Sequence, residues 1–273
     1  MKQLLIGFAN NISANKQKIL VWHKTFKQHS NANAILIAAN TTKEDKLFCE
    51  NIGLEIELVE LSDTWGINHK RIKYILDFLY KDDADIILST DVFDVAFQGN
   101  PFLKLDTDSY DFFVGSEGVK VNQEPWNANN INVLFPKYYP KCIDKQVLCS
   151  GVVAAKKHIL IKVYERMLDL CENHSTNNHP TQDQAALMVM ANNEKIEKMK
   201  IFNLDDGWVI HSAVAGPTEF WNKWGFAENL ECEKPEICGN KICNSKGMVF
   251  DIVHQFNRIP EWNDLIGKEV INV

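Results

Sequence analysis

The sequence predicts a single α/β domain in which a mostly parallel sheet is covered by helices on both faces. Two observations point to this fold class. In the first half of the chain, short apolar runs alternate with helical stretches of about 10–15 residues, the pattern of strands joined by crossover helices. No internal repeat and no low-complexity linker interrupts the 273 residues. We therefore expect one domain over residues 1–273.

Each element of the first half follows from its pattern. Strands are expected at 4–9, 34–39, 56–61 and 85–90, and helices around 19–26 and at 42–52 and 67–80. The helix at 67–80 is the clearest, because Ile72, Ile75, Leu76 and Leu79 share one face. Ligands of such sheets bind at the carboxyl ends of the strands. The residues that follow position 90 are therefore candidates for a functional site.

The second half of the chain is less regular. Strands are expected at 111–115, 151–155 and 249–253, and helices at 158–171 and 181–191. Residues 116–141 are rich in Asn, Pro and aromatic residues, and we expect them to form a long loop region. Long loops in compact domains are often functional.

The charge and the hydropathy exclude several classes of protein. The formal charge is −7, from 29 basic and 36 acidic residues, which argues against nucleic-acid binding. A single nucleotide remains possible, because a metal ion can supply the positive charge that it needs. No run reaches the roughly 20 apolar residues of a membrane span, and the apolar run near the N-terminus is too short for a secretory signal. We expect a cytoplasmic protein without a membrane span.

The seven cysteines fit a reducing compartment, because most are scattered through expected elements. The exception is the group of Cys232, Cys238 and Cys243, which crowd into a polar loop. Their spacing matches neither a CxxC pair nor a zinc finger. An incidental cluster is favoured, and a structural metal or a disulfide is the alternative.

Two carboxylates, Asp91 and Asp94, directly follow the strand expected at 85–90. Mn²⁺ and Mg²⁺ prefer hard oxygen ligands and keep coordination positions open for substrate phosphates. A D-x-x-D pair at a strand end can hold such an ion. The alternative is that both acids merely end the strand, and the spacing alone is a weak signal.

Two further groups add to this signal. His254 follows the strand expected at 249–253, and histidine is the commonest side-chain metal ligand. Its alternative role is that of a buried, hydrogen-bonded histidine. Gly66 lies in a turn before a basic helix that carries Lys70, where helix amides and the ammonium group can meet phosphate. A solvated cationic face explains Lys70 equally well.

Residues 66–101 resemble the glycosyltransferase domain of the collagen lysyl hydroxylases and its bacterial and viral relatives, through the Lys70 helix and the segment Thr90-Asp91-Val92-Phe93-Asp94-Val95. The resemblance continues in the same order at Gly115-Ser116-Glu117, Cys149-Ser150-Gly151-Val152, Asp183-Gln184 and Val253-His254. It covers roughly residues 60 to 258. The sequence departs from the family at Pro125-Trp126, which is reversed, and after His254, where the family's glycines are missing.

This resemblance implies a GT-A fold with a Rossmann-like sheet, a UDP-sugar donor and Mn²⁺, or Mg²⁺, as cofactor. It makes Asp91, Asp94 and His254 metal ligands and Asp183 and Gln184 the catalytic pair. The residues expected to contact the nucleotide-sugar are Gly66, Lys70, Thr90, Ser150, Gly151 and Arg258. It also divides the domain into a nucleotide-binding half, 1–115, and an acceptor-side half with the C-terminal metal-ligand segment, 116–273.

Asp183 has an alternative role at the start of the helix expected at 181–191. Thr181 and Gln184 fit a capping box, and an acid in the first turn stabilises the helix dipole. Trp126 can stack on a sugar, although a large aromatic residue more often packs in the interior.

These residues predict transfer of a sugar from a UDP-sugar to a hydroxyl group of a glycan or a protein. The metal and nearby cations would stabilise the charge on the leaving UDP. One alternative is a metal-dependent nucleotidyltransferase or nucleotide-sugar hydrolase, which uses the same ligands. Another is a carbohydrate-binding module without turnover, since fold does not fix function.

Overall fold

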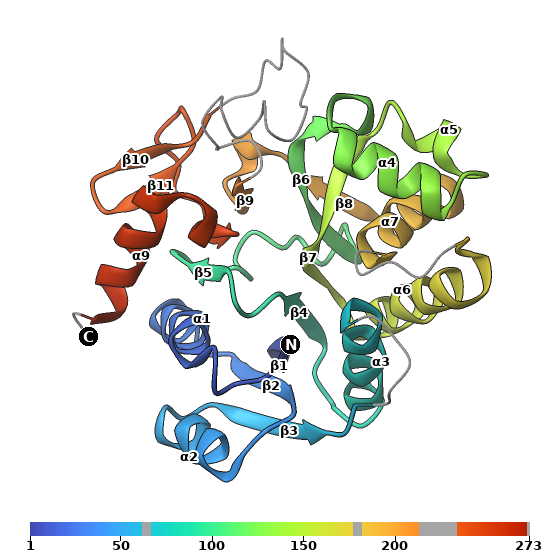
Figure 1. Ribbon diagram of the computed structural model, residues 1–273. Helices are drawn as coiled ribbons and strands as arrows, with labels where there is room; N and C mark the ends of the chain where they lie inside the picture. The colour runs from blue at the N-terminus through green and yellow to red at the C-terminus, as the bar shows by residue number, and fades with distance from the viewer. Residues whose placement is uncertain (62–66, 177–181, 213–233, 272–273) are drawn as a thin grey trace.

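The computed structural model describes residues 1–61, 67–176, 182–212 and 234–271, and the backbone alone for 67–70 and 269–271. A seven-stranded sheet crosses the molecule (Figure 1). In spatial order its strands are β3 (Glu55–Val59), β2 (Asn33–Ala39), β1 (Gln3–Asn10), β4 (Ile86–Thr90), β7 (Gln146–Lys156), β6 (Phe112–Lys120) and β8 (Met199–Phe202).

All strands of this sheet except β7 run in one direction. β1 pairs in parallel with β2 and β4, β2 with β3, and β6 with β8, whereas β7 is antiparallel to both β4 and β6. The carboxyl ends of β1 and β4 therefore lie at the same edge of the sheet. At that edge Asp91 N–H donates to the carbonyl of Gly151, which joins the end of β4 to β7.

Helices cover both faces of the sheet, as the sequence predicts (Figure 1). The larger helices are α1 (Lys16–His29), α2 (Lys43–Asn51), α3 (Ile67–Leu79), α4 (Pro125–Leu134), α6 (Lys157–Asp169), α7 (Gln182–Val189) and α9 (Pro260–Ile271). Strand β1 alternates between two apolar cores: Leu4 and Ile6 pack with α3, α6 and α7, and Leu5 packs with α1. The apolar face expected for α3 is buried as predicted.

A second sheet of three strands lies beside the first. Its strands are β5 (Val95–Phe97), β12 (Ile252–His254) and β9 (Val209–His211), with β12 in the centre, antiparallel to β5 and parallel to β9. The hairpin of β10 (Glu236–Cys238) and β11 (Lys241–Cys243) is held to this sheet by Gln98, whose side-chain amide donates to the carbonyls of Ile242, 3.0 Å, and Phe250, 3.1 Å. The small sheet thereby fixes the segment that ends at His254.

The expectation of a long loop over 116–141 is wrong. Strand β6 continues to Lys120, and α4 and the short α5 (Tyr139–Cys142) follow. The carboxylate of Glu124 caps α4, because it accepts from the backbone N–H groups of Trp126, 2.9 Å, and Asn127, 2.6 Å. Asn-rich helices have low intrinsic propensity, so this one depends on burial of Ile131 and Leu134, which periodicity alone did not reveal.

Other expectations have mixed outcomes. The expected division of the domain at residue 115 falls inside β6 and stays a prediction.

Among the described residues no helix is long and apolar enough to cross a bilayer. Cys238 and Cys243 lie on the hairpin strands as free thiols, and Cys232 lies outside the described residues. The late strand begins at Ile252, later than position 249, because the residues before it bridge to β11.

Candidate active site

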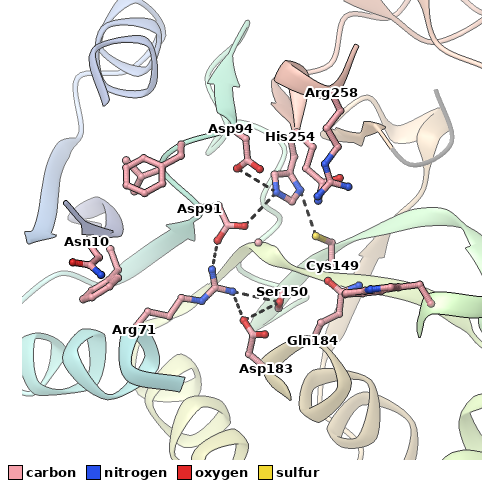
Figure 2. A pocket seen from close by; sticks show the side chains of 16 residues that line it. Asn10, Arg71, Asp91, Asp94, Cys149, Ser150, Asp183, Gln184, His254 and Arg258 are labelled. Atoms are coloured by element: carbon pink, nitrogen blue, oxygen red, sulfur yellow. Dashed lines mark hydrogen bonds and ion pairs between the residues drawn. The ribbon is translucent and has the colours of Figure 1, made fainter. Parts of the chain in front are cut away.

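A cavity of about 400 Å³ opens at the carboxyl ends of β1 and β4 (Figure 2). Its volume is in the range typical of small-ligand sites. Residues far apart in the sequence line it, among them Asn10 at the end of β1, Arg71 on α3, Ser150 on β7, Asp183 on α7 and Arg258 after β12. The cavity therefore lies where the parallel strands of an α/β sheet are expected to bind ligands.

Asp91, Asp94 and His254, which we name the carboxylate cluster, lie together on one wall of this cavity. Nε2 of His254 is 3.3 Å from Oδ2 of Asp91 and 3.7 Å from Oδ1 of Asp94. The two strand ends explain this proximity. Asp91 follows β4 directly, and Asp94 precedes β5, whose first residue, Val95, pairs with His254.

The carboxylate cluster fits a hard divalent cation. Nε2 of His254 is buried, and no hydrogen bond of acceptable geometry satisfies it in the described part of the chain. A Cβ atom at position 151 would lie only 2.7 Å from Oδ2 of Asp91 and 2.8 Å from Nε2 of His254, so only glycine leaves this space open. Two carboxylate oxygens and one imidazole suit Mn²⁺ or Mg²⁺, with open positions for phosphate oxygens.

The charges of the carboxylate cluster are strongly coupled. Burial alone would raise the pKa of the Asp91 carboxyl, but Arg71 and His254 outweigh it and hold this pKa well below its usual range. Burial and the neighbouring Asp91 raise the pKa of Asp94. Burial would lower the pKa of His254, yet Cys149, Asp94 and Asp91 outweigh it and raise this pKa. The surroundings of His254 therefore favour positive charge at the place where a cation would bind.

Arg71, for which the sequence analysis predicts no role, connects the carboxylate cluster to α7. Its guanidinium group forms ion pairs with Asp91 and Asp183, and it approaches the hydroxyl of Ser150 at 3.4 Å. That hydroxyl also donates to Asp183 at 3.3 Å. Figure 2 shows Arg71 between the two aspartates. Its only signal in the sequence was its position next to Lys70 in the basic helix.

Glu117, Asn127 and Gln184 form a second group, which we name the amide cluster. The side-chain N–H₂ of Gln184 donates to Glu117 at 3.1 Å and to Asn127 at 2.9 Å. Both protons of the amide are thereby used, which leaves the carbonyl oxygen of Gln184 as the free end of a residue that lines the cavity. Burial and the nearby Glu124 raise the pKa of Glu117 to about 7.

The other residues expected at the nucleotide-sugar have different positions. Ser150, Gly151 and Arg258 line the cavity. Thr90 does not line it, because its buried hydroxyl accepts a hydrogen bond from the Trp22 indole at 2.8 Å. Gly66 and the side chain of Lys70 lie outside the described residues, as does Thr181 of the expected capping box. Trp126 lines the cavity and is 36% exposed, so it is not a core residue.

Behind His254 lie two buried residues, His211 and Cys149, for which the sequence analysis predicts no ligand or catalytic role. Nδ1 of His254 is 2.8 Å from Nδ1 of His211 and 3.4 Å from Sγ of Cys149. Burial and the neighbouring His254 lower the pKa of His211 well below its ordinary value. His211 belongs to no recognised sequence motif, and the pairing of β9 with β12 brings it next to His254.

The fold and the site together define a GT-A domain with a carboxylate–imidazole cluster at the ends of its strands. The fold is similar to that of an active-site mutant of LgtC, with 13% sequence identity, 98% of this chain and 95% of that chain covered, and a TM-score of 0.60. It is also similar to the galactosyltransferase LgtC in complex with donor and acceptor sugar analogs, with 13% identity, 97% and 95% covered, and a TM-score of 0.58.

No family model matches the chain, and no curated protein matches it in sequence. At 13% identity the likeness to LgtC shows the fold alone. The GT-A fold expected from the sequence is therefore confirmed, whereas the closer resemblance to the lysyl hydroxylase domains stays a prediction.

Proposed function

We propose that the chain is a metal-dependent glycosyltransferase that moves a sugar from a UDP-sugar to a hydroxyl group of a glycan or a protein. One observation carries the proposal: the unsatisfied Nε2 of His254 and the carboxylates of Asp91 and Asp94 converge on one wall of the cavity. A GT-A fold with this donor set supports a divalent cation beside a nucleotide diphosphate.

Cations of the chain would hold the diphosphate. When bound, Mn²⁺ or Mg²⁺ supplies Lewis-acid stabilisation of the charge on the leaving group. Arg258 is exposed at the cavity and forms no ion pair with another described residue, so its guanidinium group is available to phosphate oxygens. Arg71 balances Asp91 and Asp183 and keeps both carboxylates oriented toward the cavity.

Asp183 and Gln184 would act at the sugar. The carboxylate of Asp183 is fixed by Arg71 and Ser150, which makes it a rigid negative group beside the expected position of the anomeric carbon. The carbonyl oxygen of Gln184 is oriented by the amide cluster and offers a second partial negative charge. Both groups would stabilise the positive charge of an oxocarbenium-like transition state. Trp126 offers an aromatic face to the sugar or the acceptor.

The proposal is tested with a panel of nucleotide-sugars in Mn²⁺ and in EDTA, with the melting temperature and the release of nucleoside diphosphate measured for each. We expect UDP-sugars to raise the melting temperature in Mn²⁺ but not in EDTA, and one of them to release UDP faster when an acceptor is added. ADP- and GDP-sugars are the matched controls. A panel in which Mn²⁺ changes neither the melting temperature nor the release would refute the proposed function.

A further inference from the structure

His211 and His254 are neighbours on paired strands. β9 and β12 run in parallel, and the register places the two histidines directly opposite each other. Their Nδ1 atoms are 2.8 Å apart, which is a hydrogen-bond distance, and the two rings are nearly perpendicular, with an angle of 87° between their planes. Both side chains are buried, at 1% exposure each. Water therefore does not compete for this contact.

The tautomer of His254 decides whether it can bind a cation. A neutral imidazole carries one ring proton, so a ring that binds a metal through Nε2 must carry the proton on Nδ1. An acceptor beside Nδ1 stabilises that form. Nδ1 of His211, at 2.8 Å, is the nearer atom able to accept, and Sγ of Cys149, at 3.4 Å, is a weaker one.

Two glycines leave room for the two rings. A Cβ atom at Gly151 would lie 2.6 Å from Cε1 of His254, and one at Gly115 would lie 2.8 Å from Nε2 of His211. Each ring thus packs against a strand position where any side chain would collide with it. The backbone at Gly115 and Gly151 therefore packs against both imidazoles and holds them in contact with each other.

We propose that His211 is a positioning residue for the metal site: its Nδ1 accepts a hydrogen bond from Nδ1–H of His254 and so holds the tautomer whose Nε2 faces Asp91 and Asp94. The inference rests on the proposed function, because it requires a cation at the carboxylate cluster. It goes further by giving a share of the metal affinity to a residue that contacts neither the cation nor the substrate. Partners of this kind typically contribute about 10- to 100-fold in affinity.

The test is a titration of the full chain with Mn²⁺ alone, followed by the electron paramagnetic resonance signal of the free ion. His211→Leu removes the acceptor and fills a similar volume, so Mn²⁺ should bind about 10- to 100-fold more weakly. His211→Asn retains an amide oxygen near the position of Nδ1, so it should recover most of the affinity. Circular dichroism of each variant reports whether it is folded.

His23→Leu is the matched control, because His23 is another buried histidine, on α1, that does not line the cavity. It should bind Mn²⁺ like the wild type. Three results would each overturn the positioning role: wild-type affinity in His211→Leu, equal weakening in His211→Asn and His211→Leu, or equal weakening in His23→Leu.

A measurement on the wild type covers the case in which His211→Leu does not fold. With ¹⁵N-labelled histidine and saturating Mg²⁺, the ring of His254 should show a protonated Nδ1 in nitrogen–proton correlation spectra. A proton on Nε2 would overturn the inference. Failure of the proposed function has a different signature: either the wild type itself binds no Mn²⁺, or it binds Mn²⁺ and transfers no sugar from any nucleotide-sugar of the panel.

Discussion

The carboxylate cluster lines the cavity and the amide cluster reaches it through Gln184, and the two satisfy their polar groups in opposite ways. In the carboxylate cluster, Nε2 of His254 has no hydrogen-bond partner among the residues that the structure describes, and the carboxyls of Asp91 and Asp94 have pKa values shifted in opposite directions. In the amide cluster, Gln184 uses both amide protons within the protein. The first cluster therefore keeps a buried ligand atom for the proposed cation, whereas the second uses its donors within the chain.

This difference separates two tasks of the proposed transferase site. An incomplete cluster of buried charges gains free energy when a ligand completes it, which favours binding. A network whose donors are already paired gains little free energy from ligand binding. It holds one group, here Gln184, in a fixed orientation, and such positioning lowers the barrier to the reaction. Substitutions should therefore divide into those that change the affinity for Mn²⁺ and UDP and those that change turnover.

The largest effect is expected at the carboxylate cluster. Asp91→Ala and Asp94→Ala should each abolish sugar transfer, because each removes one of the charged ligands that the cation needs. Calorimetry should show that UDP no longer binds more tightly in Mn²⁺ than in EDTA. Near-normal transfer by either variant would exclude that residue as a ligand, and gross unfolding would show that the acid is structural.

Asp183→Asn should lower kcat by at least about 100-fold, as expected for loss of one catalytic carboxylate. The affinity for UDP and Mn²⁺ should change little, because Asp183 is separated from the carboxylate cluster by Arg71. Steady-state kinetics and calorimetry on the same preparation measure the two quantities. If UDP affinity falls together with kcat, Asp183 does not act separately from the carboxylate cluster.

Asn127→Ala removes one of the two acceptors that orient the amide of Gln184. We expect kcat to fall about tenfold, a loss typical of supporting residues, while Mn²⁺ affinity stays unchanged. The free energy of unfolding should decrease by about 1–3 kcal/mol, because a buried donor loses its partner. Turnover like that of the wild type would show that Gln184 needs no such orientation.

The smallest effect on turnover is expected at Glu117. Its protonation should instead change the free energy of unfolding with pH. Its pKa is raised from 4.5 to about 7, so the folded state binds more protons than the unfolded state between these values. Wild-type stability relative to Glu117→Gln should therefore fall as the pH rises through this window, by up to about 3 kcal/mol. Urea unfolding of both proteins near about pH 4.5 and about pH 8 measures the difference. A difference independent of pH would mean that Glu117 ionises normally.

The sequence predicted the first half of the molecule well. Apolar runs and helical periodicity identified β1 to β4 and the buried face of α3, because each pattern is complete within one segment. The pair Asp91 and Asp94 was visible for the same reason, since a strand end and its acids are adjacent in the chain. In the second half α4 was missed, because Glu124 and core burial rather than local propensity stabilise it.

By itself, then, the sequence determined the α/β class and the strand that ends just before Asp91, and it predicted the residues that we propose to hold a cation. Only the tertiary structure decided which of them meet and what surrounds them. Arg71 pairs with Asp91 and Asp183 across three separate elements, and His211 reaches His254 through the register of two strands. The physical reason is that periodicity and propensity act over a few residues, whereas strand register and buried charge pairing join segments that are distant in the chain.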